Sequence, residues 1–135
     1  AAMTRSAESS PFYERWVEEQ PHDLDTARSA VAHRDFDGLA AVAEHNCLKM
    51  HSVMWTSRPP VVYWNHTTLA CMQRVRDLRE GGLGVFFTID AGPQVKAVCL
   101  GKDADAVAAS LAGIDGVVDV MRSGLGPGAR VVSPA

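Results

Sequence analysis

Asp90 is the residue of this chain whose sequence context most favours chemistry. It ends the run Gly84–Asp90, whose aromatic and β-branched residues predict a buried strand, and Gly92 and Pro93 then predict a tight turn. A carboxylate at a strand end has a fixed base, and the small residues Ala91 and Gly92 leave room for a substrate. Such a carboxylate can take a proton from a hydroxyl group or orient it. The alternative is a local role, in which Asp90 only accepts hydrogen bonds from the amides of the turn.

His45, Cys47 and His51 are of residue types that bind metals. They fall in one expected helix, where Cys47 and His51 share a face at positions i and i+4. His45 lies six residues before His51 and is rotated away from it. Two ligands are too few for a structural zinc, which takes four, so we expect no metal site in this chain.

Several segments follow the pattern of one family. Met50-His51 on the long helix is followed by Pro59-Pro60, Tyr63 and then the turn Asp90-Ala91-Gly92-Pro93-Gln94. Met3, the segment Glu8–Tyr13 and the glycine-rich segment Gly124–Gly128 also fit. Together they resemble the C-terminal domain of the diphosphomevalonate decarboxylases, within the GHMP kinase superfamily. The resemblance covers essentially all of this chain but only part of the family's length, as expected of a domain fragment or one piece of a split enzyme.

The resemblance implies an ATP-dependent decarboxylation of mevalonate 5-diphosphate to isopentenyl diphosphate, ADP, phosphate and CO2, a step of isoprenoid biosynthesis. Asp90 matches the family's catalytic aspartate, and Ala91 and Gly92 are expected to lie against the substrate. His51 matches the histidine of the Met-His pair and is a candidate for substrate contact. An imidazole on a helix that faces a core is more often a packing group, and this alternative stays open.

Two features qualify the match. Gln94 stands where the family usually has Asn, and its amide lies one bond further from the backbone, so it closes the turn less well; we expect a small effect on catalysis. Met3 and Ser6 correspond to a family segment near the substrate. We expect both to be disordered in this chain unless the other half of the enzyme is present.

The family's N-terminal domain carries a phosphate-binding loop that opens a helix, and no such loop occurs in these 135 residues. A triphosphate needs converging N–H groups at a helix N-terminus. Gly124–Gly128 is followed by an expected strand, Ala129–Val132, and Pro127 lacks an N–H group. The resemblance therefore implies that ATP and Mg are bound mainly by an N-terminal domain, supplied in cis or in trans, and that this chain alone is inactive.

The pattern along the chain predicts one α+β domain spanning residues 1–135. We expect helices from Pro11 to about Pro21, from Asp23 to His33, from Asp37 to about Trp55, from a cap at Thr67 to Gly81, and from Asp103 to Leu111. We expect strands at Gly84–Asp90, Val95–Leu100, Gly116–Val120 and Ala129–Val132, with Val61–Trp64 extended. This order predicts an antiparallel, split βαβ (ferredoxin-like) sheet covered by helices.

Composition excludes some classes of function. The net charge of −3 argues against a nucleic-acid surface, where a basic patch is expected. The sequence has no apolar run of membrane-spanning length and no secretory leader, so we expect a cytoplasmic protein with no membrane role. Cys47, Cys71 and Cys99 are odd in number and lack C-x-x-C spacing, and we expect all three to be reduced.

Two other functions remain open. The first is a mevalonate-type GHMP kinase, which would also use an aspartate beside the hydroxyl group but would release no CO2. The second is a binding or dimerisation module that has lost catalysis, although such a module has no evident need for Asp90. A domain separated from its partner would also expose apolar surface, so we expect some self-association, as in a homodimer.

Overall fold

The computed structural model describes residues 2–131 as five α-helices, a short 3-10 helix and a β-hairpin. The elements are α1 (Ala2–Ser9), α2 (Tyr13–His33), α3 (Phe36–Trp55), α4 (His66–Glu80), β1 (Val85–Ile89), β2 (Val95–Cys99), η1 (Gly101–Asp103) and α5 (Ala104–Ala112). The α+β class and the antiparallel strand pair are confirmed. Within residues 2–131, no helix is both long and apolar enough to cross a lipid bilayer.

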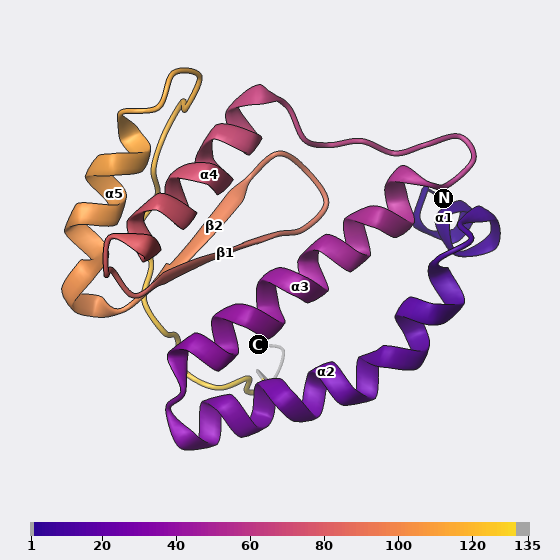
Figure 1. Cartoon of the computed structure of the whole chain (residues 1–135), viewed down its shortest axis with the longest axis horizontal. Coiled ribbons are helices and arrows are strands. Elements are labelled where there is room, and N and C mark those ends of the chain that lie inside the picture. The colour runs from indigo at the N-terminus through magenta and orange to yellow at the C-terminus, as the bar shows by residue number, and fades with distance from the viewer. Residues whose placement is uncertain (1, 132–135) are drawn as a thin grey trace.

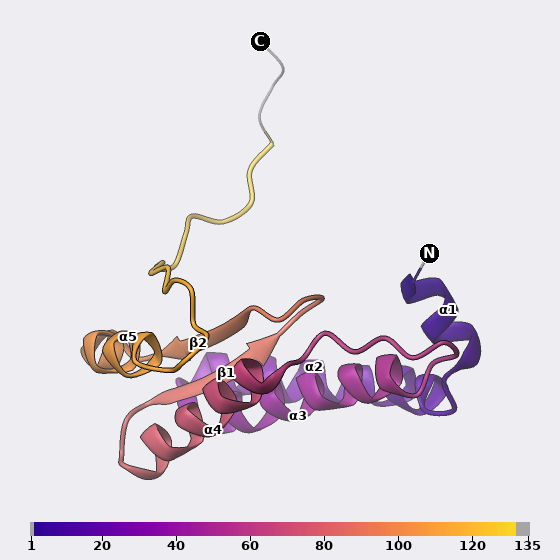
Figure 2. The same ribbon diagram turned by 90° about the horizontal axis from the view of Figure 1, so that it is seen from above.

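The hairpin lies against α3 and α4, while α2 packs along the far side of α3 and α5 flanks α4 (Figures 1 and 2). The two strands are antiparallel, with Phe87 opposite Ala97 and Thr88 opposite Lys96. Val85, Phe87 and Ile89 alternate along β1 and are fully buried. Burying a side chain such as Phe87 contributes about 1.5–3 kcal/mol, so β1 is anchored strongly just before Asp90.

The core joins α3, α4, α5 and the hairpin. Its buried members are Cys47, Cys71, Met72, Val75, Val85, Phe87, Ile89, Val107 and Leu111. The opposite face of β1 is also covered, because the rings of Phe36 and Phe86 lie 5.4 Å apart. Since β1 is buried on both faces, it reads as a continuous apolar run in the sequence.

Helix boundaries follow local capping. The Asp35 carboxylate accepts a hydrogen bond from Gly38 N at 2.9 Å and starts α3. Asn65 and Thr68 form a capping box that starts α4. The cap of α4 is therefore Asn65 rather than the predicted Thr67, whose hydroxyl instead donates to Asp115 O at 3.3 Å.

The predicted helix break at Pro21 is wrong, because α2 runs through this residue. Proline lacks the N–H group that would bond to the preceding turn, and it bends helices rather than always ending them. The ribbon of α2 changes direction along its length (Figure 1). Packing along α3 holds the helix together across the proline.

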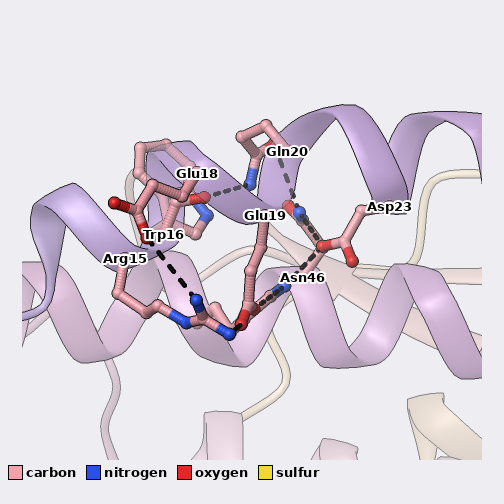
Figure 3. A network of polar contacts seen from close by, with 8 residues as sticks. Arg15, Trp16, Glu18, Glu19, Gln20, Asp23 and Asn46 are labelled. Carbon is pink, nitrogen blue, oxygen red and sulfur yellow. Dashed lines mark hydrogen bonds and ion pairs between the residues drawn. The ribbon is translucent and has the colours of Figure 1, made fainter.

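Polar contacts fasten α2 to α3 over the turn that contains Pro21 (Figure 3). Lys49 Nζ lies 2.6 Å from Asp23 Oδ2 and 3.0 Å from Glu19 Oε2. Asn46 Nδ2 donates to Asp23 Oδ2 at 2.8 Å and to Gln20 Oε1 at 3.3 Å. The network therefore spans both sides of the proline.

The N-terminal segment is ordered, contrary to the expectation of disorder. Met3 and Ser6 lie in α1, and Ser6 is buried. The turn after α1 is tied to the end of α3, since Arg58 N donates to Ser9 Oγ at 2.8 Å and the hydroxyls of Ser10 and Thr56 are 2.7 Å apart. These contacts hold the end of α1 against the end of α3.

The strand predicted at Gly116–Val120 is wrong. Val117 and Val120 pack against the core, whereas Val118 is fully exposed. This spacing of three does not match the alternation of a strand, and the segment pairs with neither strand of the hairpin. Residues 129–131 are not a strand either; the final residue of that predicted strand, Val132, is outside the described residues.

Candidate active site

Asp90 directly follows β1 and projects from the outer face of the hairpin. Side chains alternate along a strand, so Asp90 and Thr88 point away from the core that holds Ile89. The Asp90 side chain is 71% exposed, and its Oδ2 lies 2.7 Å from Lys96 Nζ. Lys96 reaches it because the hairpin register places Lys96 opposite Thr88, on the same face. The site therefore offers an accessible carboxylate beside a cation.

The turn after Asp90 depends on glycine. Gly92 has a φ of 129°, a backbone conformation that residues with a Cβ rarely adopt. A Cβ at this position would also clash with the side-chain carbonyl of Gln94, which folds back over the turn. Ala91 is exposed beside Asp90, so the two small residues leave the approach to the carboxylate open.

Three side chains of α3 bind the backbone of β1 on the edge that β2 leaves free. Glu44 Oε1 accepts from Phe87 N at 3.2 Å. The Cys47 thiol accepts from Ile89 N at 3.3 Å and donates to Ile89 O at 3.5 Å. His51 Nε2 donates to the same carbonyl at 3.0 Å. The spacing i, i+3, i+7 places all three on one face of the helix.

Glu44 is itself held by Arg79 of α4. The guanidinium donates to both carboxylate oxygens, at 2.7 and 3.0 Å, a two-pronged geometry that fixes the carboxylate strongly. This hydrogen bonding raises the pKa of Arg79, so the guanidinium stays charged. Sequence reasoning missed both Glu44 and Lys96. Spacing along the chain gave no signal for either, since Glu44 reaches Phe87 N through the packing of α3 beside β1 and Lys96 reaches Asp90 through the hairpin register.

His51 is fully buried and lies between aromatic rings. Its ring centroid is 4.5 Å from that of Trp64 and 6.5 Å from that of Trp55. Burial lowers the pKa of His51, more than the hydrogen bond to Ile89 O and the nearby charge of Asp90 raise it. The ring is therefore neutral at pH 7 with its proton on Nε2. Full burial favours a packing and hydrogen-bonding role over direct substrate contact.

Burial also raises the pKa of Cys47, so this thiol stays protonated and acts as a hydrogen-bond partner rather than a nucleophile. Cys47, Cys71 and Cys99 are all free thiols. His45 is exposed on the other side of α3 from His51. Within residues 2–131, no three His, Cys, Asp or Glu side chains gather closely enough to hold a metal ion.

The glycine-rich segment Gly124–Gly128 does not fit a triphosphate. It is exposed, and no helix follows it up to residue 131, so its N–H groups do not converge at a helix N-terminus. Of the segments singled out in the sequence, the structure brings together Asp90, Ala91, Gly92 and His51, the last through the carbonyl of Ile89. Ser9 and Arg58 meet at the junction of α1 and α3, while Trp64 packs on His51.

The sequence of this chain is similar to that of one group of known proteins. The family model described as the mevalonate 5-diphosphate decarboxylase C-terminal domain matches residues 1–122. The chain is 29% identical over 116 residues to a diphosphomevalonate decarboxylase of Aspergillus fumigatus, which covers 84% of the chain. It is 33% identical over 95 residues to a phosphomevalonate decarboxylase of Haloferax volcanii, which covers 70% of the chain. The chain spans about 29% of the length of each of these two relatives.

Solved structures share the fold. The mevalonate diphosphate decarboxylase of Staphylococcus aureus is similar with a TM-score of 0.80 and 33% identity, over 85% of this chain and 35% of that one. The enzyme of Enterococcus faecalis is similar with a TM-score of 0.78 and 35% identity, over 82% of this chain and 35% of that one. The chain therefore belongs to the mevalonate 5-diphosphate decarboxylase family, of which it carries the C-terminal domain.

Proposed function

We propose that this chain supplies the aspartate-bearing part of an ATP-dependent decarboxylase that converts mevalonate 5-diphosphate to isopentenyl diphosphate, ADP, phosphate and CO2. The observation that carries this proposal is the exposed carboxylate of Asp90 at the anchored end of β1, next to Ala91 and Gly92. Lys96 beside it adds a positive charge to the face that an anionic substrate would approach.

The chemistry explains why one carboxylate is needed. A tertiary hydroxyl is a poor leaving group, so it is first phosphorylated, and departure of the phosphate leaves positive charge near a carboxylate that is lost as CO2. Asp90 would accept the hydroxyl proton or orient the oxygen toward the phosphoryl group. Its negative charge would then favour the developing cation. Ala91 and Gly92 would let the substrate approach within hydrogen-bond distance.

ATP and magnesium would be held mainly by an N-terminal domain outside this chain. Residues 2–131 do not build a phosphate cradle, since Gly124–Gly128 leads into no helix. A related protein, designated MDDEF, has been solved in complex with MVAPP, AMPPCP and magnesium, and this chain covers 35% of it at 34% identity. That partial coverage supports a division of labour in which the other domain binds the nucleotide.

The phosphorylation state of the substrate is a second point to test. One relative is a phosphomevalonate decarboxylase, whose named substrate carries one phosphate fewer. Asp90 would act on the tertiary hydroxyl in either case. We favour mevalonate 5-diphosphate, because the matching family model and the solved relatives carry that name.

The test is ATP-dependent CO2 release, measured with this chain alone and after association with an ATP-binding N-terminal domain of the family, in cis or in trans. Mevalonate 5-diphosphate and mevalonate 5-phosphate are compared. We expect activity only in the assembled enzyme, and Asp90→Asn to lower kcat by about 10²- to 10⁴-fold. Asp115→Asn changes an exposed carboxylate after α5. It is the control and should leave kcat unchanged.

Other outcomes select the competing functions. ATP consumption that phosphorylates the substrate without releasing CO2 would assign a kinase. An assembled complex that associates but turns over neither substrate would assign a binding or dimerisation module. Activity of the chain alone would contradict the proposed division of nucleotide and aspartate between two domains.

Sedimentation of the same samples tests the assembly. We propose that the isolated chain self-associates, for example as a homodimer, through exposed apolar side chains such as Val31 and Val62. We also propose that the protein works in the cytoplasm. A single monomeric species at high protein concentration would contradict the first part. Cell fractionation with a tagged full-length protein would check the second.

A further inference from the structure

The two edges of β1 have different partners. On one edge the backbone pairs with β2, as shown by the bond from Leu100 N to Gly84 O at 2.9 Å. In an antiparallel pair, alternate residues point their N–H and C=O groups to opposite sides. Phe87 and Ile89 therefore point theirs away from β2. Of these groups, Glu44 binds the N–H of Phe87, Cys47 binds the N–H and C=O of Ile89, and His51 binds the C=O of Ile89.

His51 binds at the last peptide group before Asp90. The Ile89 carbonyl belongs to the peptide bond that joins Ile89 to Asp90, and a peptide bond is planar. Its plane includes the Cα atom of Asp90, so holding Ile89 O also limits the position of that Cα and the direction in which the carboxylate leaves the strand. Past this point the turn is exposed at Ala91, and its own packing offers little restraint.

The surroundings of His51 suit it to hold the Ile89 carbonyl in place. The ring is fully buried and packs on Trp64, so its rotamer is fixed by neighbours from α3 and from the segment before α4. Its only hydrogen-bond partner among the described residues is Ile89 O, at 3.0 Å. A leucine would fill similar space, so donation to this carbonyl is what distinguishes the histidine.

We propose that His51 is a positioning residue for the reaction proposed above: by donating Nε2–H to Ile89 O it fixes the Ile89–Asp90 peptide and aims the Asp90 carboxylate. This inference rests on the proposed function only for its catalytic consequence. The restraint on Asp90 is a property of the chain itself and can be measured without turnover.

The experiment compares His51→Leu with His51→Gln. The Gln side-chain nitrogen is the same number of bonds from the backbone as Nε2 of His, so His51→Gln keeps the donor while His51→Leu removes it. In the assembled enzyme we expect His51→Leu to lower kcat by about 10- to 100-fold, as for a displaced catalytic group, with KM for mevalonate 5-diphosphate nearly unchanged. His51→Gln should recover most of kcat.

A second readout uses the chain alone. We expect the NMR order parameter of the Asp90 N–H to fall in His51→Leu and to stay near its original value in His51→Gln, with Val75 unchanged in both. Thr68→Val, which removes a buried hydroxyl from the capping box of α4, is the matched control. It should lower stability without lowering kcat or the order parameter at Asp90.

Several results would overturn the proposal. One is full kcat in a folded His51→Leu variant, and another is an unchanged Asp90 order parameter in that variant. If His51→Leu does not fold, His51→Asn takes its place, because its amide falls one bond short of Ile89 O; equal kcat in the Asn and Gln variants would then count against positioning. If the unchanged assembled enzyme releases no CO2, the proposed function fails, and the order parameters alone decide whether His51 restrains Asp90.

Discussion

At the scale of single residues, the candidate site divides its tasks between an exposed group and a buried one. Asp90 is exposed, whereas His51 is fully buried and binds the carbonyl of the peptide group that precedes Asp90. The separation is useful because a reacting carboxylate must be accessible, while the groups that orient it gain strength from a dry environment. A mutation at either residue is therefore expected to affect turnover, through different causes.

The buried His51 makes stability depend on pH. Burial lowers its pKa in the folded chain below the ordinary 6.5, so the unfolded chain takes up a proton first as the pH falls. The contribution of neutral His51 to the free energy of unfolding is therefore complete above about pH 6.5. It is lost as the pH falls through the folded pKa, and the free energy of unfolding then drops by no more than about 1.4 kcal/mol per pH unit.

We expect urea unfolding between pH 7.5 and pH 5 to show a smaller loss of free energy in His51→Gln than in the unchanged chain. His22→Gln, at an exposed histidine on α2, is the control and should follow the unchanged chain. Parallel curves for the unchanged chain and His51→Gln would mean that another group causes the pH dependence.

Sequence reasoning predicted the position of Asp90 at the end of a buried strand but missed the contacts of Lys96 and Glu44. Asp90 was visible because the apolar run and the turn that define its position are both local. The contact of Lys96 with Asp90 depends on the register of two strands, and that of Glu44 with Phe87 N depends on how α3 packs beside β1. Neither contact can be inferred from the neighbouring residues in the sequence, so spacing along the chain alone could not assign these roles to Lys96 and Glu44.

At the scale of elements, α2 shows how tertiary contacts override a local signal. Pro21 predicts a helix end, and yet α2 continues, because its face against α3 carries the polar network of Figure 3. Lys49 is central to that network, with its side chain 16% exposed and that of Asp23 12% exposed. By contrast, α3, α4, the hairpin and α5 were predictable because their periodicity is strong.

Replacing Lys49 with Met is expected to destabilise the chain by about 1–2 kcal/mol, because Asp23 would remain partly buried without its cation. Hydrogen exchange should increase in α2 around Pro21 more than in the hairpin. Lys102→Met, at an exposed lysine, provides the matched control. Equal stability of the Lys49 and Lys102 variants would show that the network adds nothing to helix continuity.

At the scale of the whole molecule, the chain has a packed body and an exposed C-terminal stretch. Figure 2 shows this stretch leaving the body after α5. Val117 and Val120 still contact the core, whereas Met121 and Leu125 are exposed. Valines favour a strand, but a strand forms only where a neighbouring edge accepts it, and for this reason the sequence misled at Gly116–Val120.

Removing the residues after Ser123 is expected to change the free energy of unfolding by no more than about 0.5 kcal/mol, since residues 124–131 are exposed and exposed residues contribute little. Removing those after Asp115 should cost about 1–3 kcal/mol, because Val117 and Val120 are then lost from the core. Urea unfolding of the two shortened chains checks both values. A large loss of free energy of unfolding in the chain that ends at Ser123 would indicate that the residues after Ser123 pack against the body in solution.

The hydrogen bonds between α3 and β1 have a consequence for how this protein behaves when crowded. A strand with a free edge is a template on which another chain can add a strand, and many proteins aggregate by that route. Here the N–H group of Phe87 and both backbone groups of Ile89 are already bound on that edge by side chains of α3. The same three side chains that hold the end of β1 thus also protect it from edge-to-edge assembly.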